Sequence, residues 1–109
     1  MKRIFYASGS FLTSDAIADA LLGYADALAH NVGSDVVEFP IVLPNGSHGT
    51  ATTLIGPASQ VATATEESEL PEPEDDGLVL EIKRLTRQLG TPRPQVQPED
   101  EIDTKPDLD

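Results

Sequence analysis

The sequence predicts an α+β fold: a small mixed sheet of β-α-β-β order, with a further strand as an option at residues 60–65, covered by a helix at 14–30. Three observations lead to this fold class. Apolar residues between 13 and 29 repeat with the spacing of one helical face. Strand-like runs flank this helix, and Asn45-Gly46 between two of them is a strong hairpin signal. After residue 65 the chain becomes acidic and proline-containing, so we expect the sheet to end there.

The helix at 14–30 is the element around which the sheet is expected to form. Its core-facing side carries four apolar residues at one spacing: Ile17, Leu21, Tyr24 and Leu28. The remaining apolar arc, rich in alanine, is wider than contact with one sheet face needs. One interpretation is that a flank of the helix touches a second layer or another subunit: Ala18, Leu22, Ala25 and Ala29. The alternative is that alanine is present because it is the best helix former.

The strands are predicted from alternation and from chain-breaking residues. Residues 3–7 are apolar on both faces, which favours an interior strand, and the next three residues are expected to break it. Residues 35–43 alternate, with Pro40 at an edge or a bulge, and residues 50–55 form the return strand. A strand–helix–strand order implies a right-handed parallel crossover, which would make the sheet mixed.

Four segments follow from the composition. The α/β body covers residues 1–65, an acidic disordered linker 66–77, an amphipathic C-terminal helix 78–90, and a disordered acidic tail 91–109. The C-terminal helix repeats the spacing of the first helix: Leu78, Ile82, Leu85 and Leu89. We expect its apolar stripe to be a contact surface, packed either on the body or on a partner.

Composition and charge exclude several classes of function. The 109 residues contain no cysteine, so thiol chemistry and thiolate metal sites are excluded. No run approaches the ~18 apolar residues of a membrane span, and we expect a cytoplasmic protein. The alanine-, aspartate- and valine-rich, lysine-poor body suggests a bacterial source. The net charge of −12 makes nucleic-acid binding unfavourable, since phosphate affinity depends on Lys and Arg.

The charges are also segregated along the chain. Of the nineteen acids, thirteen lie in two short runs, at 66–76 and 99–109. Four of the seven basic residues lie between these runs, and three of the four are on the predicted C-terminal helix: Lys83, Arg84 and Arg87. This basic patch is interpreted either as a solvated helix face or as a surface that the acidic arms fold over.

The residues offer weak candidates for a ligand site. Ser8, Gly9 and Ser10 are expected between a strand and a helix N-terminus, where phosphates bind, but the P-loop lysine and the GxGxxG pattern are missing. His48, after the hairpin turn, could pair with a nearby hydroxyl, although no partner is singled out by spacing. We interpret the turn and His48 chiefly as structural. Two isolated histidines are a poor basis for a metal site, and no metal, cofactor or catalytic group is predicted.

These observations predict a small acidic, non-catalytic module for protein interaction or assembly, with a protein partner or a second copy as its ligand. The expected interface consists of the alanine-rich helix flank and the stripe of the C-terminal helix. One alternative is a small-ligand-binding or enzymatic domain that uses the turn at Ser8–Ser10. Another is an acidic inhibitor or mimic that binds a basic partner protein.

Overall fold

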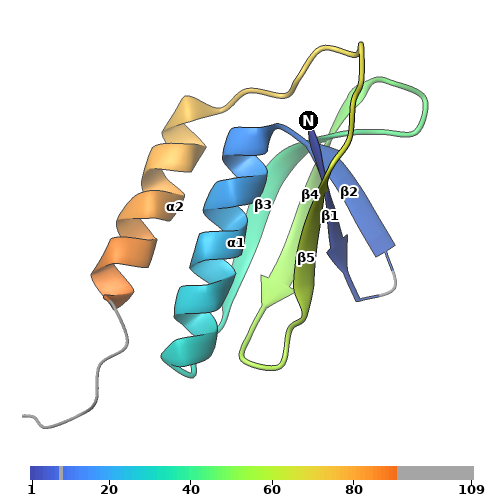
Figure 1. Cartoon of the computed structure of the whole chain (residues 1–109). Helices are drawn as coiled ribbons and strands as arrows, with labels where there is room; N and C mark the ends of the chain where they lie inside the picture. The colour runs from blue at the N-terminus through green and yellow to red at the C-terminus, as the bar shows by residue number, and fades with distance from the viewer. Residues whose placement is uncertain (8, 91–109) are drawn as a thin grey trace, which may run out of the picture.

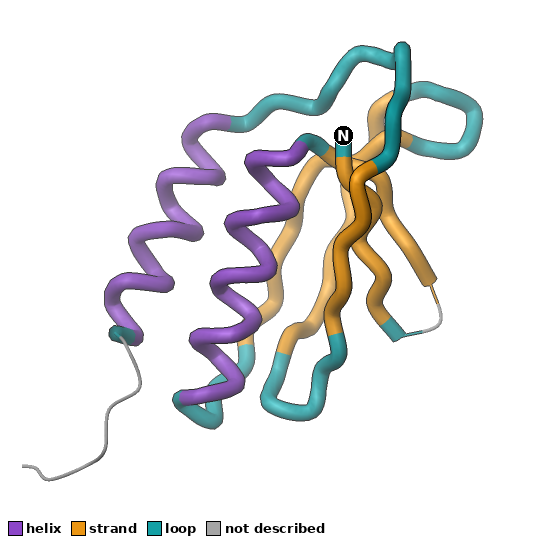
Figure 2. Tube along the Cα trace, viewed as in Figure 1, coloured by secondary structure: helices purple, strands orange, loops and turns teal. Residues whose placement is uncertain are grey.

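The computed structural model describes residues 1–7 and 9–90, and the predicted tail at 91–109 lies outside the described residues. Seven elements follow in order: β1 (Lys2–Tyr6), β2 (Gly9–Thr13), α1 (Asp15–His30), β3 (Asp35–Val42), β4 (His48–Ile55), β5 (Val61–Thr65) and α2 (Asp76–Leu89). The strands form one antiparallel sheet in the order β4-β3-β2-β1-β5. Both helices lie on the same side of this sheet (Figures 1 and 2), which confirms the α+β class.

The predicted parallel crossover is wrong. The residues expected to break the first strand and enter the helix instead form β2, which pairs with β1 from Tyr6↔Gly9 to Lys2↔Thr13. β2 then meets β3 through one antiparallel pair, Leu12↔Val42. Glycine and serine at the start of β2 have low strand preference, so their sequence resembles a loop. Tertiary pairing with β1 overrides that preference.

The optional strand at 60–65 is confirmed as β5, which pairs with β1 along its whole length. β4 and β5 stand at opposite ends of the strand order, yet residues 56–60 alone connect them. The sheet therefore curls until its two edges come close (Figure 1). Tyr6 connects β1 to the end of β4, because its hydroxyl donates a hydrogen bond to the carbonyl oxygen of Leu54.

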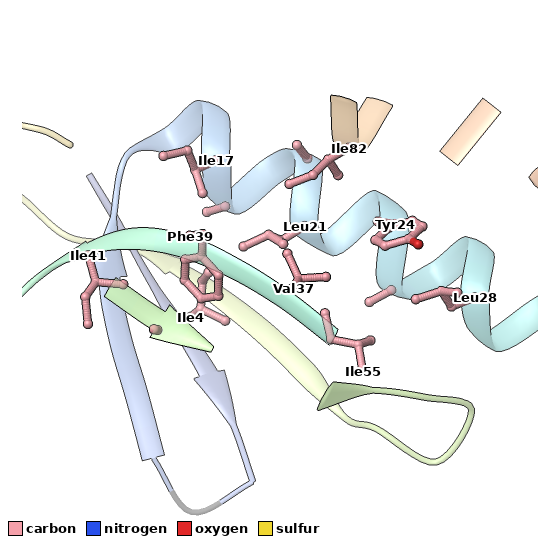
Figure 3. Close-up of a cluster of buried hydrophobic side chains, with 14 residues drawn as sticks. Ile4, Ile17, Leu21, Tyr24, Leu28, Val37, Phe39, Ile41, Ile55 and Ile82 are labelled. Carbon is pink, nitrogen blue, oxygen red and sulfur yellow. The ribbon is translucent and has the colours of Figure 1, made fainter. Parts of the chain in front are cut away.

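The core lies between α1 and the inner face of the sheet. Ser14 caps α1, its Oγ accepting the Ile17 N–H at 3.3 Å. The predicted core side of α1 is buried against inner-face residues of β1, β3 and β4 (Figure 3): Ile4, Val37, Phe39, Ile41 and Ile55. Alternation along the strands supplies this face, since successive side chains point to opposite sides.

Tyr24 fixes α1 to the start of β3. Its hydroxyl donates to Asp35 Oδ2 at 2.6 Å, while the ring is buried in the core. Burial, with the hydrogen bond to Asp35 as the second cause, raises the pKa of Tyr24 to about 12. The phenol therefore stays protonated at neutral pH and keeps its hydrogen bond to Asp35, as a buried hydroxyl requires.

The C-terminal helix packs on the body. α2 begins after Asp75, whose Oδ1 accepts the Leu78 N–H at 3.0 Å, and Gly90 follows its last residue with a φ of 78°. Ile82 is 2% exposed within the core, and four further apolar residues of α2 pack against this core: Leu78, Val79, Leu85 and Leu89. α2 thus extends the single hydrophobic core instead of standing apart from it.

Residues 66–75, within the predicted disordered linker, form neither a helix nor a strand, but they contact the body. The Glu66 N–H donates to the Met1 carbonyl oxygen at 2.9 Å, and Pro73 is fully buried. This segment, called the strap below, passes over the end of the sheet near the β3–β4 turn and continues into α2 (Figure 1).

Candidate protein-binding surface

The outer face of the sheet, opposite the helices, divides into two ends. Strand alternation places apolar residues on this face at both ends, but their exposure differs. Near the strap, Leu12 and Val42 are each 6% exposed. At the other end, Val36 and Leu54 are directly opposite each other on β3 and β4, and each is 60% exposed.

The strap is held over its end of the outer face by an ion pair. Arg3 Nε and Nη2 donate to Glu66 Oε1 and Oε2 at 2.7 and 2.8 Å, a bidentate arrangement. The hydrogen bond from Arg3 is the main reason that the pKa of Glu66 lies below its ordinary value. Arg3 Nη1 also donates to Ser10 Oγ at 3.1 Å, so the pair is tied to β2.

Contacts at the β3–β4 turn fix the middle of the strap. His48 Nε2 lies 3.0 Å from the carbonyl oxygen of Pro71, a distance at which the Nε2–H form donates. The Leu70 side chain lies over Gly46, where an added Cβ would meet Leu70 Cδ2 at 3.4 Å. Gly46 has a φ of 88°, and its N–H donates to the Leu43 carbonyl oxygen at 2.8 Å. Asn45 does not have a positive φ, so the hairpin forms without the two-residue type I′ turn that Asn-Gly favours. The strap and the outer face together line a hollow of about 550 Å³.

At the open end of the sheet, a larger groove of about 830 Å³ lies beside the β4–β5 loop and is lined by residues from both faces of the strands. Most of its wall is apolar or small, and the larger apolar side chains in the lining are Phe5, Tyr6, Leu54, Pro57 and Val61. Phe5 is 45% exposed, which is unusual for a large aromatic residue in a strand next to the sheet centre. We call this groove, together with Val36, the open apolar surface.

The groove has a fixed wall. Ser59 Oγ accepts the Gly56 N–H at 2.9 Å and lies 3.2 Å from the Tyr6 hydroxyl, which also bonds to Leu54. These bonds hold the β4–β5 loop against β1 and β4. A partner would therefore meet a preformed surface and would not need to order the loop first.

Charge is absent from the lining of this groove, as far as residues 1–7 and 9–90 define it. Glu38 lies nearby on the outer face of β3, opposite Thr52, and it is exposed. The protein as a whole carries a net charge of −12. An occupant of the groove would therefore need an uncharged, apolar anchor, and positive charge around that anchor would be attracted by the surrounding protein.

The predicted ligand-site residues are not gathered into a site. Ser8 lies outside the described residues, while Gly9 and Ser10 belong to β2. Their expected position next to a helix N-terminus is wrong, because the rest of β2 separates them from α1. His48 begins β4 and bonds to the strap, whereas Ser10 bonds to Arg3.

The predicted interface residues divide between buried and exposed positions. On α1, Ala18 and Ala25 are buried, whereas Leu22 is 37% exposed and Ala29 is also exposed. α2 approaches the other flank of α1, where Ala20 and Gly23 line a hollow with residues of α2. On α2, Ile82 and its apolar neighbours pack on the body. The expected second layer is thus α2 itself, on the flank opposite to the one predicted.

Sequence reasoning missed the open apolar surface. The apolar outer side of residues 3–7, which includes Phe5, favours burial on both faces when only the sequence is considered. The alternation of β4 places Leu54 opposite Val36, but it does not show that this end lacks a cover. An exposed patch of this kind is a signal for protein interaction that only the packed structure reveals.

Other chemistry finds no support in the described part of the chain. No group of three or more His, Asp or Glu side chains gathers there in a geometry suited to a metal ion. Neither described helix has the length and apolar character that crossing a membrane demands. Comparisons with protein-family models, with curated proteins and with solved structures found no match to this chain.

Proposed function

We propose that this protein is a non-catalytic interaction module that binds a basic protein partner through the open apolar surface. The observation that carries the proposal is the contrast on one sheet face: Leu54 and Val36 are each 60% exposed, while Leu12 and Val42, which line the hollow beside the strap, are each 6% exposed. Exposed apolar surface next to a preformed groove is typical of recognition sites.

Charge decides which partner fits best. A second copy of this chain would bring another charge of −12 to the same surface, so self-association is opposed by repulsion. A partner segment with an apolar anchor flanked by Lys or Arg gains both apolar burial in the groove and electrostatic attraction. The anchor fills the uncharged groove, and the flanking cations are attracted by Glu38 and by the net negative charge of the protein. Such complementarity mainly raises the association rate, whereas the anchor supplies most of the affinity.

Selection from a displayed peptide library tests this proposal, because it samples many candidate anchors at once. We expect selection on the full chain to enrich peptides with an aliphatic or aromatic anchor beside basic residues. Their affinity should fall at least about tenfold for Leu54→Ser, because an apolar contact in a groove is lost. Leu80→Ser is the matched control, since Leu80 is 67% exposed on α2 and lies away from the groove. Peptides that bind both variants equally would refute the assignment of this surface.

Salt dependence separates this proposal from that of an acidic mimic. A mimic binds by charge alone, so its complexes should weaken steeply between low and physiological salt. Binding at the open apolar surface should retain most of its affinity there, because the anchor is uncharged. A complex that is lost at about 0.15 M salt, where the Debye length is about 8 Å, would favour the mimic.

A further inference from the structure

A second hollow, of about 330 Å³, lies between α1 and α2. It exists because α1 presents small side chains to α2 at this point. A Cβ added to Gly23 would meet no atom within 4 Å, so the space above this residue is open. The complete lining is Ala16, Asp19, Ala20, Gly23, Lys83, Thr86 and Arg87.

Two cations border this hollow from the same helix face. Lys83 and Arg87 are four residues apart on α2, so their side chains are neighbours. The three other basic side chains in the described part of the chain are paired with carboxylates at 2.6 to 2.7 Å: Lys2 with Asp19, Arg3 with Glu66 and Arg84 with Glu81. Within those same residues, neither Lys83 nor Arg87 forms an ion pair.

The carboxylate in the lining does not neutralise these cations. Asp19 Oδ1 lies 2.6 Å from Lys2 Nζ, and this hydrogen bond is the main reason that the pKa of Lys2 is raised. The Thr86 hydroxyl already has a hydrogen-bond acceptor, since it donates to the Ile82 carbonyl oxygen at 2.8 Å. The two free donors at the hollow are therefore the ammonium and the guanidinium, which both select anions.

We propose that this hollow binds carboxylate side chains, supplied by residues 99–109 of the same chain. Six of those eleven residues are acidic, so their charge complements Lys83 and Arg87. The covalent connection favours this source over a free anion. A molecule with a net charge of −12 repels anions from solution, whereas a short tether supplies carboxylates at an effective concentration of about millimolar.

The length of the chain allows this contact. Eight residues, 91–98, separate Gly90 from Glu99, and when extended they span up to about 26 Å. Lys83 precedes Gly90 by seven residues, which corresponds to about 10 Å along a helix. The acidic run can therefore return to the hollow with chain to spare.

Paramagnetic relaxation on the full chain tests the proposal. The protein has no cysteine, so Leu108→Cys gives one site for a spin label without removing an acid. We expect broadening of the amides of Gly23, Lys83 and Arg87, and little effect at Val36 or Leu54. Replacing the six acids of 99–109 by Asn or Gln should reduce the broadening at least about threefold, because the attraction is electrostatic. Absence of broadening at α2 would overturn the proposal.

Matched variants distinguish a specific site from diffuse attraction. The pair Lys83→Gln with Arg87→Gln should abolish the broadening, whereas Arg84→Gln should retain it, since Arg84 bonds to Glu81 and does not line the hollow. Gly23→Leu fills the hollow without a change of charge and should also reduce the broadening. Ala29→Leu, on the opposite flank, is its control. Equal losses for Arg84→Gln and the Lys83/Arg87 pair would refute a localised site.

A titration with inorganic phosphate tests whether a free anion competes with the tail carboxylates for the hollow. If the tail occupies the hollow, phosphate at a few millimolar should shift the Lys83 and Arg87 amides of the tail-neutralised chain more than those of the unchanged chain. Identical shifts in both chains would show that the tail does not compete for this position and would overturn the proposal.

Discussion

The two ends of the outer sheet face have the same alternating strand pattern, but their apolar side chains differ in exposure. Leu12 and Val42 are nearly inaccessible beside the strap, whereas Val36 and Leu54 are mostly exposed beside the groove. The strands therefore do not determine which end is covered. The difference coincides with the strap, which lines one hollow with Leu12 and Val42 and is held there by the Arg3–Glu66 pair and the His48–Pro71 contact. The uncovered end is where a partner could bury the equivalent apolar area.

The largest expected difference between the two ends is in stability. Leu12→Ala should lower the free energy of unfolding by about 2–4 kcal/mol, because it removes a buried side chain and leaves a cavity. Leu54→Ala should change it by less than about 0.5 kcal/mol, since the side chain is mostly in solvent. Urea denaturation of both variants measures the difference. Equal costs would mean that the two ends are not distinct.

The strap offers an intermediate effect. Pro73→Ala should cost about 1–2 kcal/mol, because a fully buried ring loses its contacts and the unfolded chain gains freedom. Pro71→Ala gives the unfolded chain the same gain in freedom, but it removes an exposed ring. The carbonyl oxygen of residue 71 remains available to His48. Its cost should therefore be smaller, about 0.5 kcal/mol. If denaturation gave both variants the same stability, the strap would not be packed on the body.

The wall of the groove should contribute less. Ser59→Ala removes the acceptor of the Gly56 N–H and should cost about 0.5–1 kcal/mol, the usual net value of one hydrogen bond. Amide hydrogen exchange at Gly56 should become faster, while exchange in α1 stays the same. Unchanged exchange at Gly56 would show that this bond does not hold the loop.

The smallest expected effect is the pH dependence of the ion pair. The pKa of Glu66 is lowered, so its stabilising contribution is complete above the ordinary glutamate pKa of 4.5 and is lost as the pH falls through the lowered pKa. Thermal unfolding should therefore give a higher Tm for the unchanged chain than for Glu66→Gln at pH 7. This difference should vanish in strong acid. A difference that persists after Glu66 is protonated would contradict the assigned role of the charge.

Much of the fold follows from local patterns. The spacing of Ile17, Leu21 and Tyr24 predicts α1, and Asn45-Gly46 predicts the turn between β3 and β4. β2 could not be predicted in the same way. Its first residues, glycine and serine, are common in turns, and only pairing with β1 stabilises them as a strand. The parallel crossover followed from that omission.

The candidate site was less accessible to sequence reasoning, because exposure depends on what covers a residue. The acidic composition of 66–77 predicts a disordered linker, since such segments bury little apolar surface. One buried proline and one bidentate ion pair nevertheless connect this segment to the body. The apolar stripe of α2 packs on the body, whereas periodicity alone left the body and a partner as alternatives.

The central claim, that the open end of the outer face is the recognition surface, is tested most directly by methyl NMR of the full chain with a selected basic peptide. We predict that the methyl groups of Val36, Leu54 and Val61 shift on binding, while those of Leu80 and Val32 remain in place. These two controls are 67% and 81% exposed, so exposure alone cannot explain such a result. Shifts confined to Leu80, Leu22 or other helix residues, with Leu54 unchanged, would contradict the claim.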